Sequence, residues 1–204
     1  MATRLLSPAG GVERTGQRML PGQDWPRLAP GRVHEFCGPA RRTLAALVMG
    51  ATEGPVIWAY AGWQAERLMP DGLCRLADPG RIVFAAARRP EDLLWIMEEA
   101  LRSGAAPLVV AEMAEPPGLT PVRRLHLAAE AGAAARLSPQ APLGVILTPD
   151  DGGAQGVESR WRLDPAADGG WRLALLRARM VPPGDWALAP DRGGRVALDR
   201  APAA

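Results

Sequence analysis

The stretch VHEFCGPARRTLAALVMG, residues 33–50, joins a short apolar run to a Gly-Pro turn and then to an apolar helical pattern. This alternation continues along the chain, with apolar runs at 55–60, 81–87, 107–113 and 143–149 and helical patterns at 63–77, 90–104 and 119–132. Strand alternating with helix indicates βαβ units, whose sheet is mostly parallel and covered by helices on both faces. The sequence therefore predicts an α/β fold.

After Pro149 the pattern changes to a glycine-rich loop followed by short alternating runs. These runs are typical of an antiparallel β meander. They lie at 158–165, 169–179 and 185–190, and a further edge strand is expected at 194–198. We assign 1–31 to a loosely ordered arm rich in Pro, Gly and Arg, 32–190 to a single domain and 191–204 to a tail. Leu20, Trp25 and Leu28 are candidates for docking the arm onto that domain.

The chain has 204 residues and a net charge of +2, and all 24 of its basic residues are arginine. Chemistry that needs lysine, such as a Schiff base or a lysine phosphate anchor, is therefore excluded. Nucleic-acid binding would need local clusters of arginine, because the bulk charge is small. No apolar run reaches about 18 residues, and the two cysteines, Cys37 and Cys74, lie in no metal-ligand spacing. We expect a soluble cytoplasmic protein with buried thiols and no cofactor or metal.

The turn in the opening stretch resembles the start of a phosphate-binding loop, which needs two glycines five residues apart, then lysine and Ser or Thr. Counting from Gly38 places Thr43 at the second glycine and Leu44 at the lysine. Counting back from Thr43 places Arg42 at the lysine and Arg41 at the second glycine. The loop is also too short, and a planar guanidinium does not replace a compact ammonium. Residues Gly38, Pro39, Arg41, Arg42 and Thr43 are therefore interpreted as a vestigial loop.

Two other positions needed for nucleotide hydrolysis also lack their residue. Ala111 stands where a magnesium-associated acid usually ends a buried strand, and Glu112 is expected to point to the opposite face because strand side chains alternate. No carboxylate follows the second strand before Glu66. The sequence predicts a nucleotide-binding architecture without catalytic residues.

The two long helices can be described in more detail. In the first of them, residues 90–104, a core face is expected at Leu93, Ile96, Met97, Ala100 and Leu101, with Glu98, Glu99 and Arg102 toward solvent. In the second, Thr120 is expected as N-cap, Val122, Leu125 and Ala129 as core, and Gly132 as the end. Trp58 and Trp95 are expected in the core.

Four segments follow one another in the order found in ImuA-type proteins: HEFCGPARRTLAALV, PVIWAYAGW, RPEDLLWIMEEALRSGAAPLVVAE and RRLHLAAEAG. The closing residues 159–188 are similar to the last strands of the same family. The resemblance covers roughly residues 20–188. This family resembles the core of the RecA recombinase and is sometimes described as similar to the SulA cell-division inhibitor.

The resemblance implies a RecA-like domain that serves as a non-catalytic accessory in SOS-induced, error-prone translesion DNA synthesis. Its implied partners are an inactive Y-family polymerase homologue, an error-prone polymerase of the same mutasome and RecA. RecA-like strand exchange is not expected, because the loop 150–156 is acidic where a DNA-binding loop would be basic. Three alternatives stay open: a degenerate P-loop NTPase that uses Arg42 and Glu112, a DNA-binding or RecA-modulating protein, and a division inhibitor.

Several arginines are candidate contacts to a partner or to DNA. Arg123 and Arg124 share a helix whose other side faces the core; a solvated helix face is the plainer interpretation. An arginine stripe across neighbouring strands would be formed by Arg160, Arg162, Arg177 and Arg179. Arg88 and Arg89 lie near a strand end, where ordinary loop arginines are also found. Trp63 is a candidate interface anchor, with core packing as the alternative. His34 and His126 are expected to be isolated and hydrogen-bonded.

Overall fold

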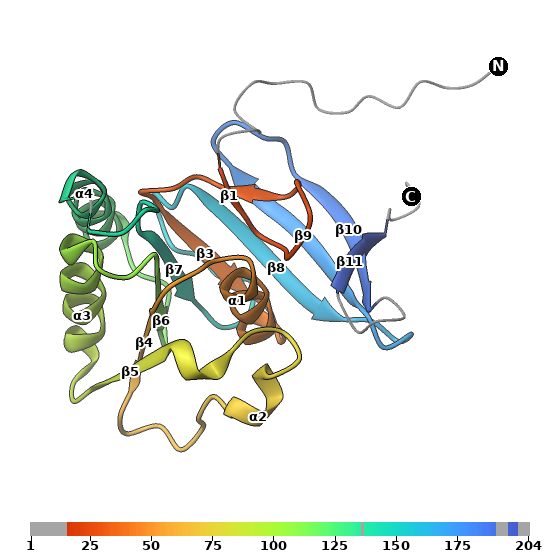
Figure 1. Ribbon diagram of the computed structural model, residues 1–204, viewed down its shortest axis with the longest axis horizontal. Coiled ribbons are helices and arrows are strands. Elements are labelled where there is room, and N and C mark those ends of the chain that lie inside the picture. The colour runs from red at the N-terminus through yellow and green to blue at the C-terminus, as the bar shows by residue number, and fades with distance from the viewer. Residues whose placement is uncertain (1–15, 136, 191–195, 200–204) are drawn as a thin grey trace.

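The computed structural model describes residues 16–135, 137–190 and 196–199. Its main feature is a nine-stranded sheet with the order β11-β10-β9-β8-β3-β7-β6-β4-β5 (Figure 1). The five strands from β3 to β5 pair in parallel: β3 (Val33–Cys37), β7 (Leu143–Leu147), β6 (Leu108–Glu112), β4 (Val56–Ala61) and β5 (Ile82–Ala87). The expected α/β fold with a mostly parallel core is confirmed.

The predicted antiparallel meander is also present, and it extends the same sheet. Its strands are β8 (Ser159–Pro165), β9 (Trp171–Ala178), β10 (Gly184–Pro190) and β11 (Val196–Asp199). β8 pairs in parallel with β3 and antiparallel with β9, so it joins the two halves. The edge strand expected at 194–198 is observed as β11 on β10.

Helices cover the parallel half on both faces, and an apolar cluster fills each interface (Figure 1). Helix α1 (Arg41–Gly50) packs on one face, where Phe36, Trp58 and Val110 are buried. Helices α3 (Pro90–Ser103) and α4 (Leu119–Ala135) cover the other, where Val109 and Ile146 are buried. Alternate residues of each strand serve the two clusters, as the pleat requires.

The helix predicted over residues 63–77 is wrong. Instead of a helix over 63–77, the structure has the single turn α2 (Pro70–Leu73), followed by the 3-10 turn η1 (Pro79–Arg81). Pro70 starts that turn, as proline does well, and cannot continue a helix from residues 63–69 because it has no amide hydrogen. The chain from Gly62 to Met69 is therefore an irregular, mostly exposed connection.

Part of the N-terminal arm is folded onto the domain. Residues 1–15 lie outside the described part, whereas 16–31 carry the two-stranded sheet β1 (Gln17–Arg18) and β2 (Arg27–Leu28). Leu20 and Leu28 are buried, and Trp25 meets Trp186 edge-on with ring centroids 6.1 Å apart. Trp161 lies 5.8 Å from Trp186, so the tryptophans pack together where the arm meets the meander.

Four further predictions about helices α3 and α4 are wrong. α3 buries Leu93, Met97 and Leu101 as expected, but Trp95 is 62% exposed because it lies about 200° around the helix from Leu93. Glu98, expected in solvent, is buried. α4 begins at Leu119, so Thr120 lies inside the helix and is not its N-cap. The helix also continues past Gly132, where α3 and α4 approach each other closely.

Of the two cysteines, Cys37 is a buried free thiol and Cys74 is an exposed one. The expectation of buried thiols is thus correct for Cys37 and wrong for Cys74. Burial raises the pKa of Cys37 to about 11. Within the described residues, no helix is both long and apolar enough to cross a bilayer.

Candidate functional site

The loop between β3 and α1 lies at the carboxyl edge of the parallel strands, where ligands bind in open α/β sheets. Its backbone amides are already hydrogen-bonded to the chain itself. The amide of Gly38 donates to the carbonyl of Asp150 at 2.9 Å, and that of Ala40 donates to Leu163 at 3.1 Å. Pro39 has no amide hydrogen. The amides of Gly38 and Ala40 are thus turned toward the protein and do not point at a phosphate.

Gly38 shows how closely the chain fills this turn. Its φ is +85°, in the left-handed region that glycine adopts without strain, and an added Cβ would lie 2.7 Å from the carbonyl oxygen of Leu163. Strand β8 therefore lies directly against the loop. Thr43 is half-buried in the first turn of α1, and Arg41 donates to the carbonyl of Gly38 at 3.2 Å.

Arg42 is bound to carboxylates rather than left free. Its Nε and Nη2 both donate to Oε2 of Glu112, at 2.9 and 2.6 Å, and its Nη1 donates to Glu66 at 3.4 Å. Trp58 donates its indole hydrogen to Oε1 of Glu112 at 2.7 Å. Burial lowers the pKa of Arg42, but the hydrogen bonds and charge of Glu112 outweigh burial and raise it.

The prediction that Glu112 points away from Ala111 is confirmed, because Ala111 packs in the cluster under α3 and α4 while Glu112 contacts α1; the face that each residue serves is the reverse of the one expected. Glu112 lies on the face that carries α1 and the vestigial loop. Arg42 and Glu112, the two residues of the NTPase alternative, are thus brought together and neutralise each other.

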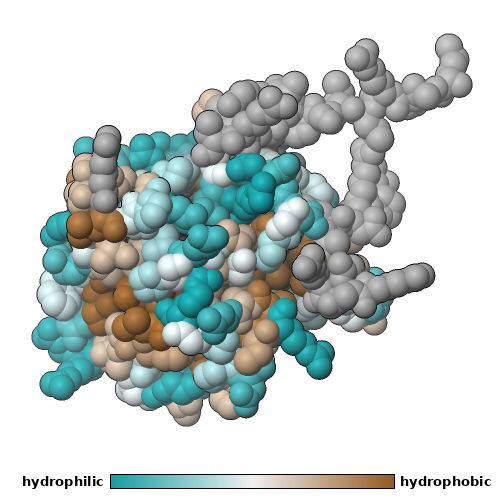
Figure 2. All heavy atoms as spheres, in the orientation of Figure 1, coloured by the Kyte–Doolittle hydropathy of each residue, from teal (hydrophilic) through white to brown (hydrophobic). Residues whose placement is uncertain are grey.

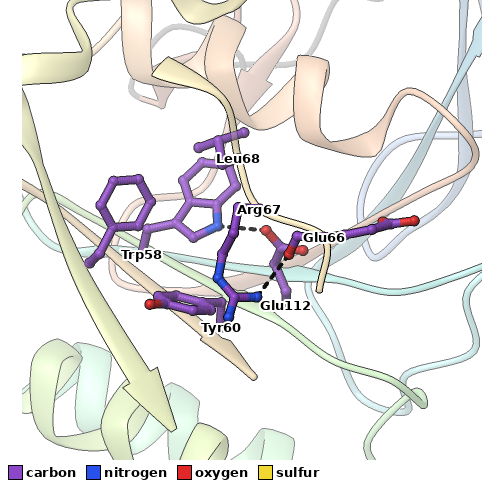
Figure 3. Close-up of a pocket in the computed structure, with 7 residues that line it drawn as sticks. Trp58, Tyr60, Glu66, Arg67, Leu68 and Glu112 are labelled. Atoms are coloured by element: carbon purple, nitrogen blue, oxygen red, sulfur yellow. Dashed lines mark hydrogen bonds between the residues drawn. The ribbon is translucent and has the colours of Figure 1, made fainter. Parts of the chain in front are cut away.

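Two cavities adjoin this ion pair, and both are lined by Glu66 and Glu112. One, of about 420 Å³, lies beside the vestigial loop and is also lined by Arg41, Arg42 and Gln64. The other, of about 220 Å³, is mostly apolar and is shown in Figure 3. Trp58, Tyr60, Phe84 and Leu68 form its walls, and Arg67 lies over the Tyr60 ring with its guanidinium carbon 4.8 Å from the ring centroid.

The proposed arginine stripe lies on β8 and β9, but most of its members contact carboxylates. Arg160 binds Glu35, Arg162 lies 2.6 Å from Asp164 and also pairs with Asp151, and Arg179 lies 3.5 Å from Glu158. Among the described residues, Arg177 alone of the four has no carboxylate within 4.0 Å.

The two candidate arginines on helix α4 also differ in whether they contact a carboxylate. Arg124 lies 2.6 Å from Glu98, which also binds Arg102, whereas Arg123 is exposed and has no carboxylate within 4.0 Å in the described part of the chain. A third cavity of about 570 Å³ lies between α3 and α4 and is lined in part by Arg124 and Trp95. Trp63 is 51% exposed, so it is not packed in the core, and its role as an interface anchor stays a prediction.

A buried anion site escaped the sequence analysis. Glu35 is fully buried in the middle of β3, and its carboxylate accepts hydrogen bonds from Thr148 at 2.7 Å, Gly153 at 2.8 Å and Ala154 at 3.0 Å. Arg160 completes the set. The glycine-rich loop thus wraps an internal carboxylate. The signal was present in the sequence, since an acid interrupts the apolar run VHEFC.

Both histidines are hydrogen-bonded within the protein, as expected, and each makes two contacts. His34 contacts Ser159 Oγ at 2.7 Å and the carbonyl of Ala29 at 3.0 Å, and burial lowers its pKa to about 4. His126 accepts from the amide of Val33 and contacts the carbonyl of Gly156 at 3.0 Å; burial lowers its pKa as well. In the ranges that the structure describes, His, Cys, Asp and Glu form no group of three suited to a metal ion.

The site therefore consists of a phosphate-loop position filled by its own chain, an internal Arg42–Glu112 pair and an aromatic cavity beside them. In a comparison with known proteins, no family model and no curated protein matches this sequence.

Proposed function

We propose that this chain is a non-catalytic, RecA-like accessory protein of SOS-induced, error-prone translesion DNA synthesis that acts by binding other proteins. The resemblance to ImuA-type proteins is the basis for proposing a role in translesion DNA synthesis. The observation that carries the non-catalytic part is the hydrogen bonding of the loop, where Gly38 and Ala40 donate to the chain's own carbonyls. A triphosphate would have to break these bonds and also separate Arg42 from Glu112.

An exposed apolar surface supports action through protein contacts. Strand β5 is one of the two edges of the sheet, and among the described residues only β4 pairs with it; it contains neither charge nor proline, the usual protections of an edge strand. Val83 and Phe84 on it are 53% and 45% exposed, and Figure 2 shows apolar side chains gathered over this edge. Val83 and Phe84 point to opposite faces of the sheet, because neighbouring strand residues alternate. Together with the exposed Trp63 and Ala86, we call these residues the β5 surface, which includes both faces of this edge. Such surfaces mark interaction sites.

The proposed partners are the inactive Y-family polymerase homologue and the error-prone polymerase of the mutasome, with RecA as a third. The test is a pull-down of the purified polymerase homologue by the full-length chain, with an ATP-hydrolysis assay on the same preparation. We expect capture without hydrolysis. Hydrolysis that disappears on Arg42→Ala would overturn the non-catalytic proposal, and failure of all three partners to bind would overturn the interaction proposal.

A second candidate is residual nucleotide binding, favoured by the cavity of about 420 Å³ that places Arg41 and Arg42 beside Glu112. A thermal-shift titration with Mg-ATP separates the two candidates, because a ligand that binds only the folded state raises the melting temperature. Direct DNA binding would depend on Arg123 and Arg177. A gel-shift series at rising salt tests it, since phosphate contacts weaken steeply with salt.

A further inference from the structure

Helices α3 and α4 lie side by side and run in the same direction (Figure 1). Arg124 of α4 lies 2.6 Å from Glu98 of α3, and further along both helices Gly132 packs against Gly104 at the end of α3. The first contact makes each residue of α3 level with the residue of α4 that comes 26 positions later. Trp95 is therefore level with Pro121.

The side of these helices that faces away from the sheet has an exposed tryptophan beside a cavity. Trp95 is 62% exposed and borders the cavity of about 570 Å³, whose apolar lining comes from Leu94, Pro121 and Leu125. Leu127, on the outer side of α4, is 56% exposed. The cavity has room for an indole ring, and aromatic side chains dominate the binding energy of protein interfaces. This outer face can therefore both supply and receive a tryptophan.

The two helices also carry opposite charge. Helix α3 has four acidic residues and one arginine, whereas α4 has two arginines and one acidic residue. An acidic helix and a basic helix thus lie next to each other on one molecule. After a half-turn, each of them meets the other, so the face is complementary to itself. The partner that matches it in charge is a second copy of this chain.

We infer that two copies of this chain associate through the outer faces of α3 and α4, with Trp95 of each copy in the cavity of the other. The two-fold axis runs parallel to the helices and places α3 of one copy on α4 of the second copy. Because this rotation keeps level residues level, Trp95 meets Pro121 of the second copy. A two-fold axis across the helices would stack α3 on α3 and set acidic residues against each other.

Glu99 and Arg123 give this arrangement a specific contact. Successive helix residues are 100° apart, so Glu99 is turned further from the cavity than Glu98, and Arg123 further than Arg124. The half-turn brings these two outward sides together, with Glu99 and Arg123 of the second copy about 3 Å apart along the axis. Arg123 has no carboxylate within 4.0 Å in the described part of its own chain, and the second copy supplies one. The inference is independent of the proposed function, since it involves neither a polymerase nor a nucleotide.

Sedimentation velocity of the full-length protein over a concentration series tests the inference. We expect a reversible monomer–dimer equilibrium in the wild type. Trp95→Ala should weaken the dimer about tenfold or more, because it removes the aromatic anchor of both halves of the interface. Met180→Ala is the matched control: Met180 is 73% exposed but lies after β9, so its replacement should leave the equilibrium unchanged.

Mixing two charge variants tests the orientation. Arg123→Glu alone, or Glu99→Arg alone, sets like charges against each other at both symmetric contacts, and each should weaken its own dimer about fivefold or more. An equimolar mixture of the two variants restores opposite charges at both contacts. We expect the mixed dimer, followed with one variant fluorescently labelled, to form about as tightly as the wild type. Arg75→Glu, at an exposed arginine near α2, is the control and should leave the dimer intact.

A wild-type protein that stays monomeric up to about 100 µM, where a dimer with a Kd of about 10 µM would predominate, would overturn the inference. So would a dimer that ignores Trp95→Ala, or a variant mixture that does not recover association. A dimer lost with Phe84→Ala but kept with Trp95→Ala would place self-association at the β5 surface instead. If Trp95→Ala fails to fold by circular dichroism, the mixing experiment decides, because misfolded variants do not recover on mixing.

Discussion

Arg42 and Glu112, 70 positions apart in the sequence, are joined by two hydrogen bonds in which Nε and Nη2 of the arginine both donate to the same carboxylate oxygen, Oε2. The pair links the first turn of α1 to the end of β6, and Trp58 holds the remaining carboxylate oxygen. Arg42 and Glu112, which a bound nucleotide would need as free groups, therefore connect helix α1 to the sheet instead.

Replacing Glu112 with glutamine should destabilise the protein by about 2–3 kcal/mol, because Arg42 and the Trp58 indole then share a neutral, weaker acceptor. Urea unfolding measures the change. Arg172→Ala, which breaks the exposed contact to Asp185, is the control and should cost under about 0.5 kcal/mol. Equal effects of the two variants would show that the Arg42–Glu112 pair is merely a surface contact.

Glu35→Gln should be more damaging, by about 3–5 kcal/mol, since it leaves Arg160 without its counter-charge and turns an amide toward the donors of Gly153 and Ala154. Hydrogen exchange at the Gly153 and Ala154 amides should accelerate along with the fall in the unfolding midpoint. Glu99→Gln, on the exposed side of α3, is the matched control. Unchanged exchange at both amides would contradict this assignment.

His34 should make stability depend on pH. Its pKa is lowered by burial to about 4 from the usual 6.5, so the unfolded chain binds a proton that the folded chain rejects between these values. The stability that depends on a neutral His34 is fully present above pH 6.5. It is lost as the pH falls toward 4, and the total loss in the free energy of unfolding is about 3 kcal/mol. Unfolding free energies of wild type and His34→Gln, measured from pH 7 to 4.5, should converge as the pH falls. Parallel curves would rule the effect out.

Gly132→Ala should destabilise the protein although alanine favours helices by about 1 kcal/mol. A Cβ at this position would overlap the carbonyl oxygen of Leu101 and press on Pro142. We expect a net loss of about 2 kcal/mol in thermal or urea unfolding. Gly118→Ala, where an added Cβ meets open space, should be nearly neutral. A stabilised Gly132→Ala protein would mean that α3 and α4 pack less closely than described.

Sequence patterns correctly predicted the strands and helices whose local residue pattern matches their burial in the folded protein. Strands β6 and β7 are continuous apolar runs with both faces buried, and α3 has a proline start and a regular stripe of Leu93, Met97 and Leu101. The 63–77 segment shows the limit. Its helical composition is interrupted by Pro70, and nothing local reveals that the chain runs irregularly to that turn.

The candidate site was harder to predict because it depends on long-range pairing. The missing lysine is visible in the sequence, but the filling of the loop by the carbonyl of Leu163 depends on β8 lying beside β3. Likewise, alternation predicts that Glu112 faces away from Ala111, and only the position of α1 tells which face that is. Glu35 needed partners from residues 148–160, more than a hundred positions away.

The place of β3 between β7 and β8 has a consequence for how the protein is made. This strand leaves the ribosome early, but its two neighbours, β7 and β8, end at residues 147 and 165. The strand can therefore pair with them, and Glu35 can meet its hydrogen-bond donors, only after most of the chain has been synthesised. Such non-local pairing folds slowly, and nascent intermediates with unpaired strands are prone to aggregate. Newly synthesised molecules should therefore depend on chaperones far more than mature ones do.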